Sequence, residues 1–380
     1  MRRTVAILLL GSCSLATACL NDRDTVGNEM RQSPEVGRSL IGWFDRLPNE
    51  YYQRRIDRLR AKSKLSPNEY DDMAVAYVRM GDSQNALATI DRKAELPLKG
   101  EDLYRLHANR GTFLLIRWIQ EGARPENLDL LKRGENDIAK AVRLKPGSHF
   151  GRESTQLELM RWMLYKSKHP DNVGLGTWLL KRTTPDQKAG TKPDHSQGLA
   201  GLISLGAAWE MADTAAALAA LQAERMHFQL ADFSRLRAAE LQTSGKTPFS
   251  TRGTEADLTS GIEHDPAYYA GVNYLKSYAK ECFTILRAAS KERDEKLQAY
   301  VKSRLAADRH SDTDSAFWSE WREPAMPDLP RMPRTHDGVR EAILGTLIGI
   351  GVFLAITTYL LIRIVRGYRL KRGLRNQIKA

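Results

Sequence analysis

The side chains that most often carry chemistry are few and widely spaced in this sequence. It holds eight histidines and three cysteines. No two histidines follow H-E-x-x-H or H-x-x-x-H, the spacings that put two zinc ligands on one face of a helix, and the cysteines form no C-x-x-C pair. The spacing therefore predicts no metal ion and no cofactor.

One cysteine and one acidic stretch are the remaining candidates. Cys282 lies in AKECFTILRAA, among apolar residues at helical spacing, which predicts a small core residue rather than a nucleophile. HSDTDS, at 310–315, has alternating acids that could hold calcium, but it lacks the glycine and the distal glutamate of an EF-hand loop. We predict a capped turn there. Trp318 and Trp321 follow it and either pack on the last helices or face a membrane surface.

Motifs of the common enzyme classes are missing as well. The sequence has no phosphate-binding Walker loop, no G-x-G-x-x-G after a strand and no G-x-S-x-G elbow. It therefore predicts no catalytic residues and a protein that is not an enzyme. A site of unfamiliar spacing, hidden in the irregular loops, is the alternative.

The N-terminus has the layout of a secretory signal. In MRRTVAILLLGSCSLATACL, two arginines precede a short apolar run and an A-x-A site, so we predict a signal peptide over 1–18. L-A-T-A-C resembles the bacterial lipobox, whose cysteine carries lipid, which makes Cys19 a lipidation candidate. A cleaved signal without lipid and an uncleaved anchor are the alternatives.

The C-terminus predicts a membrane span. Residues 342–362 carry no charge and are long enough to cross a bilayer as a helix. The basic tail at 363–380 marks the cytoplasmic side, which predicts a single-pass protein of the bacterial inner membrane with 19–341 in the periplasm. Gly345 and Gly349 form G-x-x-x-G, the spacing of close transmembrane packing, so a homodimer is an alternative to a monomer.

The net charge of +12 comes mostly from these two ends. Residues 1–19 and 339–380 hold ten basic residues and one acid, which leaves 48 basic and 45 acidic residues, a net of +3, between them. A body with so little net charge predicts no nucleic-acid partner.

Prolines fall at every third position, 324, 327, 330 and 333, just before the span. Polyproline II has three residues per turn, so these prolines share one edge of an extended helix. Twelve residues reach roughly 37 Å in this form, which predicts a semi-rigid stalk that holds the body off the membrane. The alternative is a proline-rich ligand for another domain.

Helical periodicity dominates the body from about 50 to 307. Ser66-Pro67 predicts a helix start, Gly81-Asp82 a turn and the following run a second helix. This unit resembles one tetratricopeptide repeat, a helix–turn–helix of 34 residues. The matching residues are Tyr70, Met73, Ala74, Tyr77, Gly81, Ala86 and Ile90. Lys93 departs from the resemblance, which has a small residue there.

A second unit resembles the same repeat up to about residue 150. Gly111 matches the small position of its first helix, and its second helix matches at Gly134, Ile138, Ala141, Leu144 and Pro146. Arg110 departs from an apolar position, and the loop between the helices is longer. The resemblance implies an all-α fold, a solenoid of helix pairs, to which the uncharged run 342–362 adds one C-terminal transmembrane helix.

The remaining boundaries follow from composition. We predict, in order, a signal peptide (1–18), a lead segment (19–47), repeats (48–180), a loop (181–197), a helix pair (198–242), a loop (243–265), terminal helices (266–308), a proline-rich stalk (309–337), the span (342–362) and the tail (363–380). The terminal helices read either as a pair or as one long helix.

The resemblance implies a scaffold that binds envelope proteins or peptides in the concave groove of the repeats. The residues that it places in the groove are Asn68, Asp71, Val75, Val78, Arg79, Arg105, Thr112 and Leu115. Arginines there would suit peptide carboxylates. The alternatives are a sensor that signals through transmembrane packing, and an envelope assembly factor or enzyme.

Overall fold

The structure is a computed structural model. It describes residues 30, 33–169, 173–182, 194–205, 208–246, 248–249, 257–258, 266–330, 347–348 and 357–359, without the side chains of 150 and 266–276. The chain divides into two compact units, Met1–Pro330 and Arg331–Ala380. The signal peptide, Cys19, Gly345, Gly349 and most of the predicted span lie outside the described residues.

Within the described residues the secondary structure is helical and contains no strand, so the all-α prediction is confirmed. The α-helices are α2 (Pro34–Ile41), α3 (Asn49–Arg60), α4 (Pro67–Arg79), α5 (Ser83–Ala94), α6 (Gly100–Gln120), α7 (Leu128–Leu144), α8 (Arg152–Lys166), α9 (Leu175–Lys181), α10 (His195–Ser204), α11 (Ala212–Glu224), α12 (Phe228–Thr243) and α14 (Pro266–Ala306). Two 3₁₀ turns, η1 (Pro125–Asn127) and η2 (Ser148–Gly151), precede α7 and α8. No helix in this part of the chain is long and apolar enough to cross a membrane.

The first predicted helix–turn–helix starts and turns where the sequence indicates. Ser66 caps α4 with a full capping box, in which its side chain accepts from the Glu69 N–H and the Glu69 carboxylate accepts from the Ser66 N–H. Gly81 has a φ of 84°, a left-handed conformation that suits glycine, and Asp82 then caps α5. The predicted helix start and turn are confirmed.

Two glycines let α6 and α7 cross closely. A Cβ atom on Gly111 would lie 2.9 Å from the carbonyl oxygen of Gly134, and a Cβ atom on Gly134 would lie 2.9 Å from the carbonyl oxygen of Gly111. Ile138 Cγ1 would be only 2.8 Å from the added atom on Gly111. Since backbone atoms cannot move aside, both positions require glycine for this packing.

Both residues that depart from the repeat pattern are ion-paired inside the fold. Lys93 is fully buried, and its Nζ donates to Asp71 Oδ2 at 2.6 Å. Arg110 Nε donates to Asp137 Oδ2 at 2.7 Å, and Asp137 is 5% exposed. In each case a carboxylate on another helix neutralises the charge that replaces a small or apolar residue.

The stretch 198–242, predicted as one helix pair, contains parts of three helices. Helix α10 begins at His195, inside the predicted loop 181–197, and packs against α8 and α2. Helices α11 and α12 then pack against each other. Every residue of α11 from Ala212 to Ala223 is buried, so this helix has no polar face from which its limits could be read.

The predicted loop 243–265 is anchored to the helices at two described points. The Phe249 ring lies 5.7 Å from Trp118 and 5.5 Å from Trp162, between centroids. The Asp257 carboxylate accepts the backbone N–H groups of Gly176 and Thr177 at the start of α9. Burial raises the pKa of Asp257 to about 6, against the effect of these hydrogen bonds.

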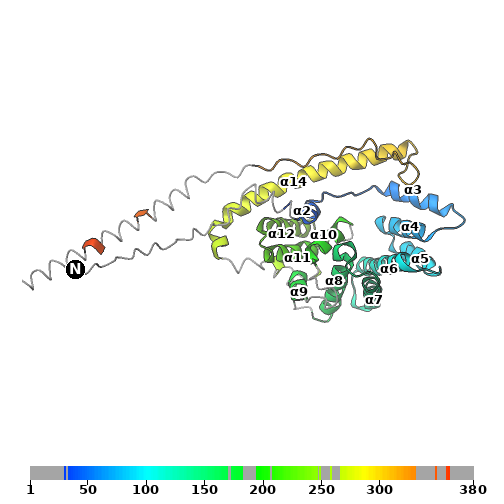
Figure 1. The fold of residues 1–380 in the computed structure, drawn as a ribbon, viewed down its shortest axis with the longest axis horizontal. Coiled ribbons are helices and arrows are strands. Elements are labelled where there is room, and N and C mark those ends of the chain that lie inside the picture. Colours follow the sequence, from blue (N-terminus) through cyan, green and yellow to red (C-terminus); the bar gives the residue numbers. More distant parts are fainter. Residues whose placement is uncertain are drawn as a thin grey trace, which may run out of the picture. The chain divides into compact units, whose positions relative to one another are not determined.

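Residues 266–306 form one long helix, α14. The sequence predicts either a helix pair or one long helix here, and the structure has the long helix. Helix α14 packs against α12 and α2 and also against α3. It runs beside helices from both ends of the described body, as Figure 1 shows. It is therefore not a further helix pair after α11 and α12.

The predicted free-standing stalk is corrected over its described part. Beyond α14 the chain turns back and runs along the same helix, as the orange trace in Figure 1 shows. Arg293 of α14 binds Glu323, and Tyr278 of α14 donates to the carbonyl oxygen of Pro330 at 3.1 Å. These contacts hold the segment against the body, up to the last residue of the first unit.

Candidate functional site

A groove of about 240 Å³ opens between four helices of the first unit. Its walls come from α4, α6, α8 and α10. The lining residues are Val75, Val78, Arg79, Ala108, Asn109, Thr112, Phe113, Ile116, Arg152, Glu153, Gln156, Leu202 and Leu205. The walls combine aliphatic side chains with a few polar groups, the composition of a binding site.

Four of the eight predicted groove residues line this groove. Val75, Val78 and Arg79 come from the last two turns of α4, and Thr112 comes from α6. Because residues three and four apart share a helix face, the three α4 side chains lie along one wall.

The other four predicted residues lie elsewhere. Asp71 is 8% exposed and binds Lys93. Asn68 accepts from Arg105 Nη1 at 3.0 Å, and Arg105 is also paired with Glu101. Leu115 is buried, at 6% exposed, and is not among the lining side chains.

A series of hydrogen bonds spaces the helices that carry the groove. Asn109 of α6 donates to Asp71 of α4 at 3.0 Å. Gln156 of α8 donates to Thr112 of α6 at 2.9 Å. Side chains 38 and 44 residues apart thus join these helices at the groove itself, since Asn109, Thr112 and Gln156 also line it. Because each bond is partly buried, it restrains both the spacing and the rotation of the helices that it joins.

The same kind of contact joins α8 to α10. Thr155 Oγ1 and His195 Nδ1 are 2.9 Å apart in a buried hydrogen bond. A Cβ atom on Gly198 of α10 would lie 2.1 Å from that Thr155 oxygen, so α10 approaches α8 through a glycine. Burial lowers the pKa of His195, which favours the neutral ring in this contact.

Charge in the groove is unbalanced. Arg152 Nη2 donates to Glu153 Oε1 at 2.7 Å, so these two groups neutralise each other. Among the described residues no carboxylate lies within ion-pair distance of Arg79, which is half-buried in the opposite wall. The groove can therefore offer one guanidinium to an anionic group.

The far wall was missed by sequence reasoning. Arg152, Gln156, Leu202 and Leu205 come from α8 and α10, beyond the two recognised units. Leu205 is 44% exposed, a large apolar side chain facing solvent at the groove. The sequence did contain a signal for this wall. Asn109 follows Asp71 by 38 residues and Gln156 follows Thr112 by 44 residues, so a polar residue recurs at about 40 positions.

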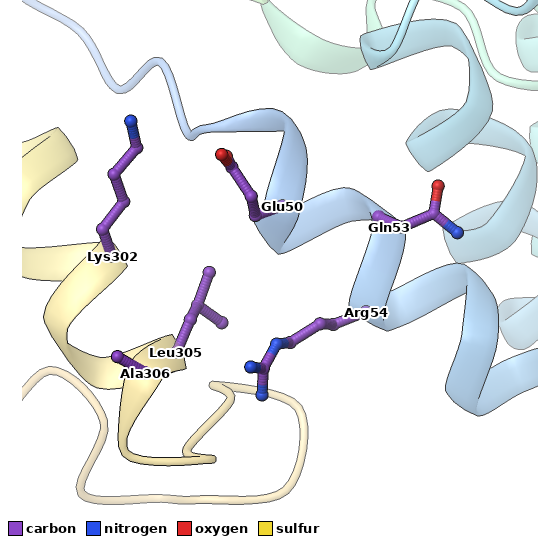
Figure 2. Close-up of a pocket in the computed structure, with 6 residues that line it drawn as sticks. All are labelled: Glu50, Gln53, Arg54, Lys302, Leu305 and Ala306. Atoms are coloured by element: carbon purple, nitrogen blue, oxygen red, sulfur yellow. The ribbon is translucent and has the colours of Figure 1, made fainter.

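Two further hollows lie against α14. One, of about 460 Å³, separates its end from α3 and is lined by Glu50, Gln53, Arg54, Lys302, Leu305 and Ala306, as Figure 2 shows. The other, of about 400 Å³, is apolar and is lined by Asp232, Arg235, Leu236, Ala239, Leu258 and Lys280. Neither contains a residue that the sequence singled out.

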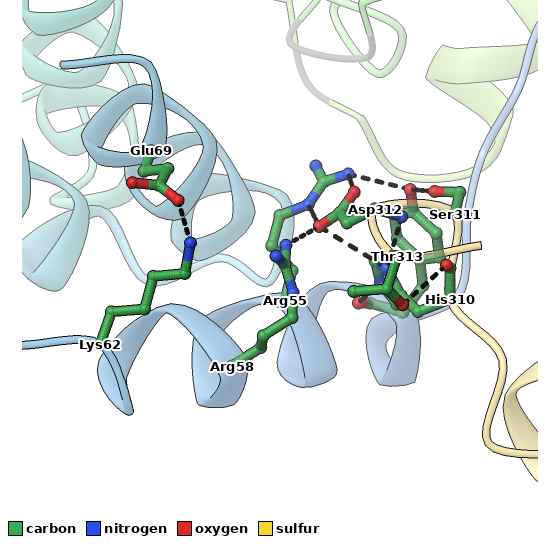
Figure 3. Close-up of polar contacts among 9 residues, drawn as sticks. Arg55, Arg58, Lys62, Glu69, His310, Ser311, Asp312 and Thr313 are labelled. Atoms are coloured by element: carbon green, nitrogen blue, oxygen red, sulfur yellow. Dashed lines mark hydrogen bonds and ion pairs between the residues drawn. The ribbon is translucent and has the colours of Figure 1, made fainter. Parts of the chain in front are cut away.

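The acidic stretch 310–315 is used for internal ion pairing. Figure 3 shows Arg55 and Arg58 of α3 converging on Asp312. His310 Nε2 donates to the Tyr51 carbonyl oxygen at 3.0 Å, and its Nδ1 accepts the N–H of Asp312 at 3.1 Å. The turn is thereby fixed to α3.

The other candidates for chemistry sit inside the fold. Cys282 is fully buried, and burial raises the pKa of its thiol. Within the described ranges, no three histidine, cysteine or carboxylate side chains gather as metal ligands would. Trp318 and Trp321 pack around Tyr300 of α14, at ring-centroid distances of 5.9 and 5.5 Å.

Comparisons with protein-family models, with curated proteins and with solved structures gave no match. The site therefore has to be interpreted from its own geometry.

Proposed function

We propose that this chain is a non-enzymatic, membrane-tethered scaffold of the periplasm that binds a segment of another envelope protein. In this proposal the helix pairs form a solenoid similar to tetratricopeptide repeats, and their first helices line the binding groove. The packing of successive helices and the shared groove of α4, α6, α8 and α10 support it.

The observation that carries the proposal is the groove itself. At about 240 Å³ it is smaller than the usual pocket of a drug-sized ligand, and it is open to solvent. Its size suits one or two side chains of a peptide. Val78, Phe113, Ile116 and Leu205 provide apolar walls for them.

The guanidinium of Arg79, which has no paired carboxylate among the described residues, defines the second requirement on the partner. An aliphatic side chain seated between Val78 and Leu205 would leave a neighbouring carboxylate within the range of Arg79. A planar guanidinium can hold a carboxylate through two parallel hydrogen bonds. The partner segment that we propose is therefore apolar with an adjacent acidic group.

Crosslinking of the full chain in its native membrane, followed by mass spectrometry, tests this function. Wild type is compared with Arg79→Glu and with Arg92→Glu, which makes the same charge change at an exposed site on α5. We expect one partner to be captured by wild type and by Arg92→Glu and lost from Arg79→Glu. Equal capture by all three proteins would exclude the groove as the binding site, and turnover of a substrate by the isolated protein would favour an enzyme.

A further inference from the structure

The segment after α14 lies in register with that helix. We call residues 321–330 the strap. Its fixed points, Glu323 and Pro330, are seven residues apart, which span roughly 22 Å as polyproline II. Their partners on α14, Arg293 and Tyr278, are 15 residues apart, which is also roughly 22 Å of α-helix. The two lengths agree, so the strap is extended and antiparallel to α14 between these points.

One phase of the strap faces solvent, with Arg322, Ala325 and Asp328 all exposed. Pro324, Pro327 and Pro330 are half-buried, as are Met326 and Leu329, whereas Glu323 is exposed. The proline edge predicted from the sequence is thus the edge that faces the body. No strap residue is fully buried, so the apolar contact is shallow.

The Glu323 carboxylate accepts several of the hydrogen bonds that hold the strap. Its carboxylate accepts from Arg293 at 2.5 and 3.0 Å, from Trp43 Nε1 at 2.9 Å and from Trp321 Nε1 at 3.1 Å. Arg293 is only 6% exposed and also donates to Asp45 at 2.7 Å. One carboxylate therefore joins the strap to α14 and to the segment between α2 and α3.

We propose that the strap is a releasable part of the tether and that Glu323 is its latch. The apolar contact is shallow and the Glu323 carboxylate is 46% exposed, so the strap belongs to the part of the fold that opens most easily. When the latch opens, the ten strap residues add roughly 31 Å of extended chain between the body and the C-terminal unit. The point where the chain leaves the body also moves along α14 by roughly 22 Å.

This device sets how far the body can reach from whatever holds the C-terminal unit. It rests on the proposed membrane attachment of the C-terminal unit, but not on the groove or on the proposed partner. In the latched form the prolines of the strap pack against the body, so other proteins cannot bind them. Release makes both the added length and the prolines available.

Limited trypsin cleavage after Arg322, in the full chain in its native membrane, measures the open population directly. Cleavage of a transiently opened segment follows the fraction that is open. We expect Glu323→Gln and Glu323→Ala to be cut roughly ten-fold faster than wild type, after each rate is divided by that of a free peptide with the same residues around Arg322, because each removes the charge-assisted bonds to Arg293. Trp43→Phe, which removes one of the hydrogen bonds to the Glu323 carboxylate and leaves the Arg293 pair in place, should have a smaller effect.

Glu320→Gln is the matched control. It removes the same charge three residues earlier, where Glu320 is 71% exposed and pairs with Arg304. Its cleavage should match wild type. Circular dichroism verifies that every variant keeps its helix content. Wild-type cleavage rates in both Glu323 variants would overturn the latch, as would an equal acceleration in Glu320→Gln.

Discussion

Lys93 Nζ lies 2.6 Å from Asp71 Oδ2, and no part of the lysine side chain reaches solvent. The pair joins the two helices of the first helix–turn–helix. Asn109 of the next pair donates to the other oxygen of Asp71 at 3.0 Å. Burial raises the pKa of Asp71, although Lys93 and Asn109 act in the opposite direction. A single carboxylate thus links three helices below the groove.

Removing one member of this pair should destabilise the fold strongly. We expect Lys93→Ala to lower the free energy of unfolding by about 3–5 kcal/mol, because it leaves a buried carboxylate without its cation. Thermal unfolding of the full chain in detergent, followed by circular dichroism, measures the change. Lys93→Met with Asp71→Asn should recover much of the loss, since no buried charge remains. An unchanged melting temperature in Lys93→Ala would contradict a paired, buried lysine.

The glycine crossing of α6 and α7 should not accept a methyl group. We expect Gly111→Ala to destabilise the protein by about 1–3 kcal/mol, because the added carbon meets the Gly134 backbone. The control is Gly201→Ala in α10, where the new carbon meets only the flexible Arg152 side chain, at 3.3 Å. Alanine should be neutral or stabilising there because of its helix propensity. Equal effects at the two positions, measured by thermal unfolding, would argue against a close crossing.

Acid should detach the segment that follows α14. Burial alone would raise the pKa of Asp312 and of Glu323, but the hydrogen bonds from Arg55 and Arg293 hold both below their ordinary values. The stabilisation is therefore fully present above about pH 5 and is lost as the pH falls through the lowered folded-state pKa values. Asp45, the other carboxylate on Arg293, remains near the arginine when Glu323 is protonated.

Acrylamide quenching of Trp321, taken as the difference between wild type and Trp321→Phe, follows this detachment. Trp321 should stay protected down to about pH 4 and become accessible below it, while helix content is retained. The fully buried Trp118 serves as the internal reference. Release on raising the pH, or simultaneous loss of helix content, would contradict a local acid-sensitive attachment.

Local sequence signals predicted the first two helix pairs well. Ser66 with Glu69, the turn at Gly81 and the small residues Gly111 and Gly134 act within or between adjacent helices. Their effect depends on spacing along the chain, which the sequence displays.

The rest depended on contacts that the sequence does not display. The limits of α11 were hidden because its residues from Ala212 to Ala223 are all buried and carry no period. The far wall of the groove depends on how α8 and α10 pack. The sequence predicts a free stalk where the strap lies, because Arg293 and Trp43 bind Glu323 from 30 and 280 residues away.

The most direct test of the groove is site-specific photo-crosslinking from its wall. A photoreactive amino acid replaces Val78, inside the groove, or Arg92, on the exposed face of α5, in the full chain in intact cells. We predict that Val78 captures a defined partner segment with an apolar residue beside an acidic one. We also predict that Arg92 does not capture it and that Arg79→Glu abolishes the Val78 product. Capture from Arg92 alone, or a Val78 product that survives Arg79→Glu unchanged, would contradict the account.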